Sequence, residues 1–165
     1  MTKTKISNGL EINYEFHLGD TSHVLVFVHG LGANSTIWQK EFEHFKKKNF
    51  SVLMMDLRCH GGSSCKKNSR FRNFRTDLNS LLIKLKIKKI ILIGHSLGGM
   101  IALDFYSNYP KKVKSIISID SSYEISLRTL NPFTPFQILL RKALGIFGGN
   151  RKNISWQNLH SADYQ

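Results

Sequence analysis

Four short, mostly apolar runs, separated by stretches with helical patterning, are the feature that most constrains how this chain can fold. Each run has the length of one strand, and an apolar run of that length is typical of a strand buried on both faces of a parallel sheet. The runs are Val24–Val28, Val52–Met55, Ile90–Ile93 and Val113–Ile119. Strands that alternate with helices in this way predict an α/β fold built on a doubly wound, mostly parallel sheet.

The segment before the first run predicts an N-terminal hairpin. Two short alternating stretches within Lys3–Phe16 are separated by Asn8-Gly9, a strong signal for a two-residue turn. Helices are predicted between the later runs. One begins near Ser35 or Thr36, with a capping box at Thr36, a second has an apolar face over residues 74–85, and a third, largely apolar, covers Leu97–Tyr109.

Polar and glycine-rich residues follow the predicted strands, each at the carboxyl end of its strand. They are His29-Gly30-Leu31-Gly32, Asp56, Ser96 and Asp120. Carboxyl ends of parallel strands meet at one edge of a sheet, and ligand sites of doubly wound sheets lie there. We therefore expect these residues to converge on one site.

Ser96 is the candidate nucleophile at this edge. It lies in Gly94-His95-Ser96-Leu97-Gly98, between a predicted strand and a predicted helix. This pattern is typical of a serine held in a strained turn, with its hydroxyl clear of the sheet at the positive end of the helix. Gly94 and Gly98 are expected to prevent collisions across the turn, and Gly99 to let the helix pack closely. The hydroxyl becomes reactive only if a base takes its proton. The alternative is a helix start without chemistry.

Two backbone N–H groups are candidate donors to the oxyanion of an acyl-transfer intermediate. Leu97 follows Ser96 at the start of the helix. Leu31 lies between two glycines in the loop after the first run, where the missing side chains let the backbone approach a substrate. The alternative for that loop is a plain tight turn.

Together these segments resemble the N-terminal half of an α/β-hydrolase of the serine-nucleophile branch. The matching segments are His29-Gly30-Leu31-Gly32, Asp56-Leu57-Arg58-Cys59-His60-Gly61-Gly62-Ser63 and Gly94-His95-Ser96-Leu97-Gly98-Gly99. The resemblance covers residues 6–122. It implies a core in residues 1–122, the start of a helical cap or lid in 123–165, and a sheet that lacks the family's C-terminal strands.

The resemblance also implies the roles of single residues. Ser96 would be the nucleophile, and Leu31 and Leu97 the oxyanion donors. The supporting residues would be His29, Gly30, Gly32, Gly94, His95, Gly98 and Gly99. Arg58 and His60 are interpreted as loop supports. Cys59 departs from the family, which has glycine there, and costs roughly 1–2 kcal/mol if the backbone needs a positive φ.

The catalytic base is expected to be missing from this chain. In the family the acid and the histidine follow the nucleophile, normally beyond the cap. Asp120, at the end of the last predicted strand, is a weak candidate for the acid. His160, in a polar tail, is a weak candidate for the base. Three interpretations remain: a truncated or split hydrolase, an enzyme with an improvised triad, and a non-catalytic binding or interaction module that keeps the sheet.

The family activity implied is hydrolysis of a small-molecule ester or thioester, with no cofactor and no metal. A serine rather than an aspartate in the turn at position 96 disfavours the dehalogenase and epoxide-hydrolase branches of the family. A second chain that supplies the missing C-terminal half is a possible partner. Without those C-terminal strands, the last predicted strand would be an open apolar edge that favours self-association.

Composition excludes some classes and sets a location. The chain has 24 Lys and Arg against 11 Asp and Glu, but the lysines are scattered in the sequence and carry no recognition motif, so we expect no nucleic acid. No apolar run is long enough to span a membrane. Cys59 and Cys65 are expected to be free thiols. With no signal-peptide core at the N-terminus, these features predict a cytoplasmic protein.

Overall fold

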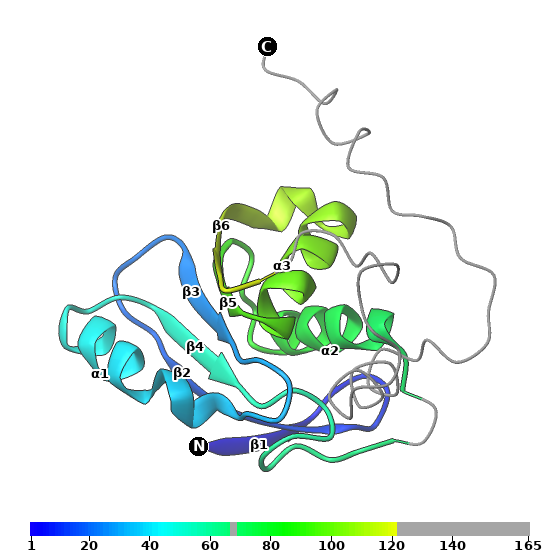
Figure 1. Ribbon diagram of the computed structural model, residues 1–165. Helices are drawn as coiled ribbons and strands as arrows, with labels where there is room; N and C mark the ends of the chain where they lie inside the picture. Colours follow the sequence, from blue (N-terminus) through cyan, green and yellow to red (C-terminus); the bar gives the residue numbers. More distant parts are fainter. Residues whose placement is uncertain (67–68, 122–165) are drawn as a thin grey trace.

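The computed structural model describes residues 1–66 and 69–121, which form a six-stranded sheet with helices on both faces (Figure 1). The elements are β1 (Thr2–Lys5), β2 (Glu11–His17), β3 (Val24–Val28), η1 (Ser35–Trp38), α1 (Gln39–Lys47), β4 (Val52–Met55), α2 (Phe71–Lys84), β5 (Ile90–His95), α3 (Leu97–Asn108), η2 (Pro110–Lys112) and β6 (Val113–Ile119). The four apolar runs are all strands, as predicted.

The sheet has the strand order β1-β2-β4-β3-β5-β6. Strands β4, β3, β5 and β6 are parallel, and β1 and β2 form an antiparallel hairpin at one edge. The predicted fold class, a doubly wound and mostly parallel sheet with an N-terminal hairpin, is confirmed. From β3 the chain moves first to β4 on one side and then to β5 on the other, so right-handed crossovers place the helices on opposite faces.

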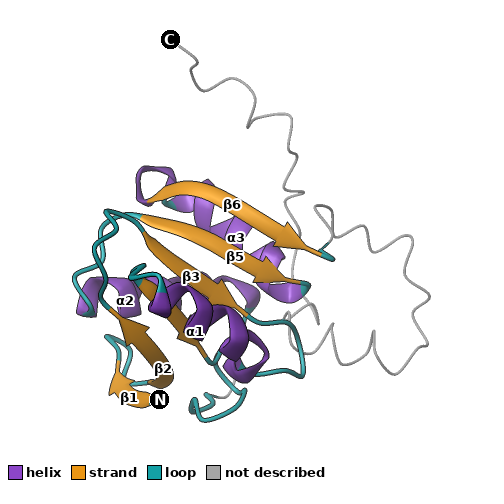
Figure 2. Cartoon of the chain, turned by 90° about the vertical axis from the view of Figure 1, so that its left-hand side faces the viewer, coloured by secondary structure: helices purple, strands orange, loops and turns teal. Residues whose placement is uncertain are grey.

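Two apolar layers hold the helices to the sheet. Figure 2 shows α1 on one face of the sheet and α2 and α3 on the other. Alternate residues of β3 divide between the layers: Val24, Val26 and Val28 pack with α2 and α3, whereas Leu25 and Phe27 pack with α1. A strand with an apolar residue at every position is needed because β3 is covered on both sides.

The first helical segment begins at Ser35, as predicted, but a different residue caps it. Asn34, rather than Thr36, caps the turn, because the Asn34 Oδ1 accepts a hydrogen bond from the Thr36 N–H at 3.0 Å. The segment starts as a 3-10 helix, and α1 follows at Gln39.

Strand β6 forms the last edge of the sheet within residues 1–66 and 69–121. Ile117 and Ile119 on it are 51% and 42% exposed, so an apolar surface lies at this edge. The expected cap helix, the boundary after residue 122 and His160 lie outside the described residues.

Candidate active site

Ser96 occupies the turn between β5 and α3 with φ +52° and ψ −115°. A non-glycine residue in this region is strained by roughly 1–3 kcal/mol, and neighbouring contacts must hold it there. The Ser96 N–H donates to the Ile119 carbonyl at 2.9 Å, and the Ser96 carbonyl accepts from the Ser121 hydroxyl at 2.8 Å. The predicted strained turn is confirmed, and the end of β6 helps to hold it.

The glycines around Ser96 lie where a side chain would meet backbone atoms. A Cβ on Gly98 would lie 2.2 Å from the Val28 carbonyl oxygen, and one on Gly94 would lie 2.3 Å from the Gly98 carbonyl carbon. A Cβ on Gly99 would instead meet side-chain atoms, the hydroxyls of Ser118 and Ser121 at 2.5 Å and the Ser121 Cβ at 2.6 Å. Because these glycines have no side chains, α3 can start directly against β3 and β5.

The loop after β3 lies against Ser96. In the parallel register Val28 is paired with Gly94, so the loops that follow β3 and β5 begin side by side. A Cβ on Gly30 would be 3.2 Å from the Ser96 Cβ and 3.0 Å from the His95 Nδ1. Gly32, in the same loop, has a φ of +73°.

His29 is fully buried and holds this loop in place. Its Nε2 accepts a hydrogen bond from the Leu57 N–H at 2.9 Å, and its Nδ1 donates to the Gly30 carbonyl at 2.7 Å. Burial is the main reason that the pKa of His29 is lowered to about 4. Because both ring nitrogens are occupied and the ring is neutral at neutral pH, His29 supports the loop and does not act as a base.

The bonds at Gly30 also orient the next N–H. The Gly30 carbonyl accepts from the His29 Nδ1 at 2.7 Å and from the Ala33 N–H at 3.3 Å. In a trans peptide the N–H points away from the carbonyl, so the Leu31 N–H points the opposite way. Leu97 is the first residue of α3, where an N–H has no helical partner. No residue that the structure describes accepts a hydrogen bond from the N–H of Leu31 or Leu97.

We expect acid to destabilise the protein through His29. The unfolded chain binds a proton on this histidine below pH 6.5, whereas the folded protein resists protonation until about pH 4. Stability is therefore complete above pH 6.5 and falls as the pH drops toward 4, by up to about 3 kcal/mol. Urea unfolding at pH 7 and pH 4.5 measures this loss. The control is His44→Gln at an exposed histidine, which should leave the loss unchanged, whereas His29→Asn should reduce it. An equal loss in all three proteins would contradict the prediction.

Asp56 at the end of β4 organises the neighbouring loops. Its carboxylate accepts hydrogen bonds from the Ser35 N–H at 2.8 Å, the Ser35 hydroxyl at 2.5 Å, the Asn13 amide at 2.7 Å and the Gly62 N–H at 2.7 Å. Burial alone would raise the pKa of Asp56, but these hydrogen bonds outweigh it and hold the pKa below its ordinary value. With this many donors, Asp56 is a structural anion. The sequence alone did not indicate Asn13 or Ser35 as its partners.

Arg58 and His60 make the contacts of loop supports, in line with their interpretation from the sequence. The Arg58 guanidinium forms two hydrogen bonds of 2.6 Å with Asp77 of α2, and both side chains are buried. The His60 Nδ1 donates to the Arg58 carbonyl at 2.8 Å, and its ring lies 5.2 Å from the His29 ring. The loop after β4 is thereby tied to α2 and to His29.

The expectation of free thiols is wrong, because Cys59 and Cys65 form a disulfide. Cys59 has a φ of +62°, so the chain turns sharply and brings the two Cα atoms to 4.3 Å. The family has glycine at position 59, and the backbone there does need a positive φ. A cysteine in this conformation costs roughly 1–2 kcal/mol. The thiol state thus no longer supports a reducing compartment.

A family model described as the alpha/beta hydrolase fold matches residues 23–158. The chain belongs to the α/β-hydrolase fold family. A protein of Haemophilus influenzae named as an esterase/lipase is 32% identical over 117 residues, which are 67% of this chain and 39% of that protein.

Solved α/β-hydrolases are similar as well. A carboxylesterase structure from Nitrososphaera gargenis is 36% identical with a TM-score of 0.66, over 72% of this chain and 44% of the other. A thermophilic esterase from Thermogutta terrifontis is 27% identical with a TM-score of 0.69, over 75% of this chain and 47% of the other. The chain thus spans less than half the length of these three relatives.

Asp120, the weak candidate for the acid of this α/β-hydrolase, lies near His95. Asp120 has a side chain that is 91% exposed, and its Oδ2 lies 4.0 Å from the His95 Nε2. The His95 Nδ1 is buried and has no hydrogen-bond partner among the described residues. Within residues 1–66 and 69–121 no histidine forms a hydrogen bond with the Ser96 hydroxyl.

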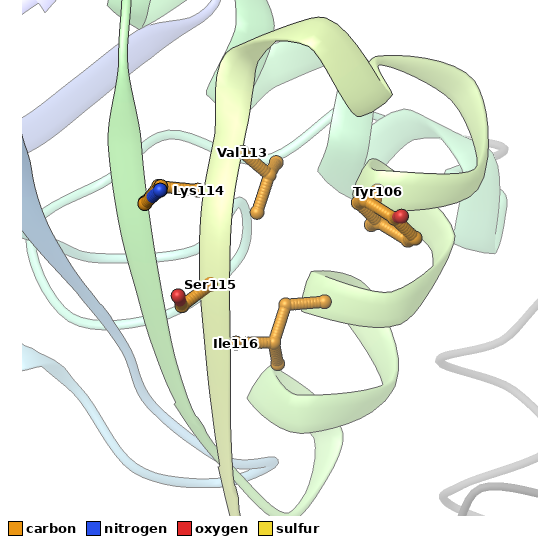
Figure 3. A pocket seen from close by; sticks show the side chains of 5 residues that line it. All are labelled: Tyr106, Val113, Lys114, Ser115 and Ile116. Carbon is orange, nitrogen blue, oxygen red and sulfur yellow. The ribbon is translucent and has the colours of Figure 1, made fainter. Parts of the chain in front are cut away.

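A hollow of about 230 Å³ lies between α3 and β6, away from Ser96 (Figure 3). It is lined by Tyr106, Val113, Lys114, Ser115 and Ile116. Val113 and Ile116 extend from β6 toward α3, which carries Tyr106. Tyr106 follows Ser96 by ten residues along α3, or roughly 15 Å, so the hollow is not a pocket for a substrate at Ser96.

No helix in residues 1–66 and 69–121 is long and apolar enough to cross a membrane.

Proposed function

We propose that this α/β-hydrolase acts on small carboxylic esters or thioesters with Ser96 as the nucleophile. The observation that carries the proposal is the strained backbone of Ser96, at φ +52°, beside the loop of Gly30. Strain of this kind persists where the surrounding structure imposes it, and it is concentrated at functional sites. The names of the Haemophilus protein and of the two solved esterases agree with this reaction class.

The reaction begins when the Ser96 hydroxyl attacks the ester carbonyl carbon and a base takes its proton. The carbonyl oxygen becomes an oxyanion, which the N–H groups of Leu31 and Leu97 stabilise. The tetrahedral intermediate then expels the alcohol or thiol, which takes the proton from the base, and leaves an acyl group on Ser96. Water attacks this acyl-enzyme and gives a proton to the base, which passes it to the Ser96 oxygen as the carboxylic acid is released.

The base that takes the Ser96 proton is proposed to lie outside the described residues. His29 is occupied on both nitrogens, and Asp120 is exposed and directed at His95. In solved relatives the matched segment is under half of the chain. We propose that a longer form of the protein, or a second chain, supplies the histidine and the acid.

A fusion protein tests this function. Residues 1–121 are joined to the C-terminal half of the Nitrososphaera carboxylesterase, and hydrolysis of p-nitrophenyl acetate and labelling by a fluorophosphonate are measured. We expect Ser96 to be labelled in the fusion and ester turnover to exceed that of the 165-residue chain by about a thousandfold or more, because the residues that the structure describes supply only the oxyanion donors.

Three outcomes would count against parts of the proposal. A fusion that unfolds cooperatively but leaves Ser96 unlabelled would favour the non-catalytic module. Turnover that survives Ser96→Ala would exclude this serine as the nucleophile. Rapid labelling of the 165-residue chain that is lost in His160→Ala would place the base within this chain.

A further inference from the structure

Lysines that are scattered in the sequence lie together at the edge of the sheet where the parallel strands begin. Helix α1 leads directly into β4, and α2 leads directly into β5, so both helices end at this edge. The four segments at this edge are residues 17–23, 46–51, 84–89 and 108–114. They contain Lys46, Lys47, Lys48, Lys84, Lys86, Lys88, Lys89, Lys111, Lys112 and Lys114, which we call the lysine edge.

Hydrogen bonds join these four segments in series. The Asp20 N–H donates to the Asn49 carbonyl at 3.0 Å, and the Val24 N–H donates to the Lys89 carbonyl at 3.1 Å. The Lys89 ammonium donates to the Lys111 carbonyl at 2.8 Å. The lysine edge is therefore a continuous part of the molecule, although its residues come from four stretches of sequence.

The charge of the lysine edge is almost uncompensated. Asp20 is the only carboxylate in the four segments. Of the ten lysines, only Lys46 lies within 4.0 Å of a carboxylate that the structure describes, that of Glu43 at 3.7 Å. Helix C-termini favour cations, which accounts for Lys46, Lys47 and Lys84 but not for Lys86, Lys88, Lys89 and Lys114. A surface of one charge sign indicates a partner of the opposite sign.

We propose that the lysine edge binds an anionic lipid bilayer and holds the protein with Ser96 turned toward water. Leu18, 75% exposed, lies in the loop between β2 and β3 at this edge and provides an apolar side chain for the lipid interface. Basic segments beside anionic headgroups, with an apolar side chain among them, are typical of attachment at a membrane surface.

Nucleic acid is the less favoured partner. The four segments contain no arginine, the residue whose planar fork matches a phosphate in two places. Their aromatic residues, Phe50 and Tyr109, pack against the two cores and offer no exposed ring on which a base could stack.

The attachment also sets the orientation of Ser96. Ser96 follows the carboxyl end of β5, and the lysine edge lies at the other end of that strand, six residues or roughly 20 Å away. A bound molecule would take a substrate from the aqueous phase. This part rests on the proposed function, whereas binding to the bilayer does not.

Vesicle sedimentation tests the proposal with the 165-residue chain. Vesicles of phosphatidylcholine alone are compared with vesicles that also contain phosphatidylserine, at low and high salt. The variant replaces Lys86, Lys88, Lys111 and Lys114 by Gln. The matched control replaces Lys3, Lys40, Lys66 and Arg72, also exposed, by Gln and removes the same charge.

We expect binding only with phosphatidylserine, and less of it at high salt. Each lysine near the surface contributes up to about fivefold, so the lysine-edge variant should lose at least about tenfold and the control variant much less. An environment-sensitive dye at Leu18→Cys should respond to vesicles, and the same dye at Arg72→Cys, at the start of α2, should not.

Three results would overturn the proposal. The first is the absence of binding to phosphatidylserine vesicles. The second is an equal loss in both variants, which would mean that only net charge matters. The third is binding to an RNA or DNA oligonucleotide that is tighter than vesicle binding and depends on the same four lysines. None of these readouts uses hydrolysis, so failure of this proposal is distinct from failure of the proposed function.

Discussion

Ser96→Ala and Ser96→Gly are each expected to reduce ester hydrolysis by the fusion protein at least about a thousandfold, because neither side chain can form an acyl-enzyme. The two variants should differ in stability. At φ +52° and ψ −115° an alanine keeps the strain of the serine, whereas glycine adopts this conformation freely. Relief of roughly 1–2 kcal/mol, less the cost of about 0.5–1 kcal/mol for ordering glycine, leaves Ser96→Gly more stable than Ser96→Ala by about 1 kcal/mol.

Hydrolysis and urea unfolding of the two variants, measured side by side, check this expectation. The Ser96 side chain makes no capping hydrogen bond to α3, so its removal should cost little by itself. If Ser96→Gly were less stable than Ser96→Ala by about 0.5–1 kcal/mol, the ordering cost alone, the turn would not be strained. Full activity in either would show that Ser96 is not the nucleophile.

Gly98→Ala is expected to destabilise the protein by about 3 kcal/mol or more, a large part of the stability of a typical domain. The new Cβ would lie 2.2 Å from the Val28 carbonyl oxygen and 2.9 Å from the His29 carbonyl oxygen. Both are backbone atoms next to β3, the strand between β4 and β5, so relief requires that α3 move away from the sheet.

Gly99→Ala is the matched control, one position along the same helix. Its Cβ would meet the hydroxyls of Ser118 and Ser121 at 2.5 Å and the Ser121 Cβ at 2.6 Å. The hydroxyls can rotate away, whereas relief of the last contact requires a shift of Ser121, which follows the edge strand β6. Alanine should also gain up to about 1 kcal/mol over glycine in the helix at either position. Because Ser121 lies beyond the edge strand and Val28 ends a central strand, we expect Gly99→Ala to destabilise the protein less than Gly98→Ala. Urea unfolding measures both variants, and similar losses in the two would contradict the close approach of α3 to β3.

The elements around Ser96 were predictable because their signals are local. A buried strand needs apolar residues at consecutive positions, so β3, β4 and β5 are visible within four to six residues each. The turn at Ser96 needs glycines at fixed offsets, because the collisions that they prevent lie within one turn of helix or on the adjacent strand. The cap of the first helical segment was misassigned, since Asn34 caps η1. A capping box at Thr36 and an asparagine two residues earlier are equally good local signals.

The supports of the site were not predictable, because their partners are far apart in the sequence. Asp56 bonds to Asn13 across 43 residues, and Arg58 bonds to Asp77 across 19. The tautomer of His29 is set by the Leu57 N–H, which β4 brings to it from 28 residues away. The disulfide was missed for a related reason. Two cysteines six residues apart form a bond only if the loop turns back, and the turn depends on a positive φ at Cys59.

By itself, the sequence determined the strand–helix alternation, the hairpin and the turn that presents Ser96, since each depends on residues that are neighbours along the chain. The tertiary structure decided where the charge lies. Lysines that look evenly spread in the sequence precede β4, β5 and β6 or end the helices that lead into them. Parallel strands joined by right-handed crossovers must all begin at the same edge, so the lysines that precede them become one basic surface, at the end of the sheet opposite Ser96.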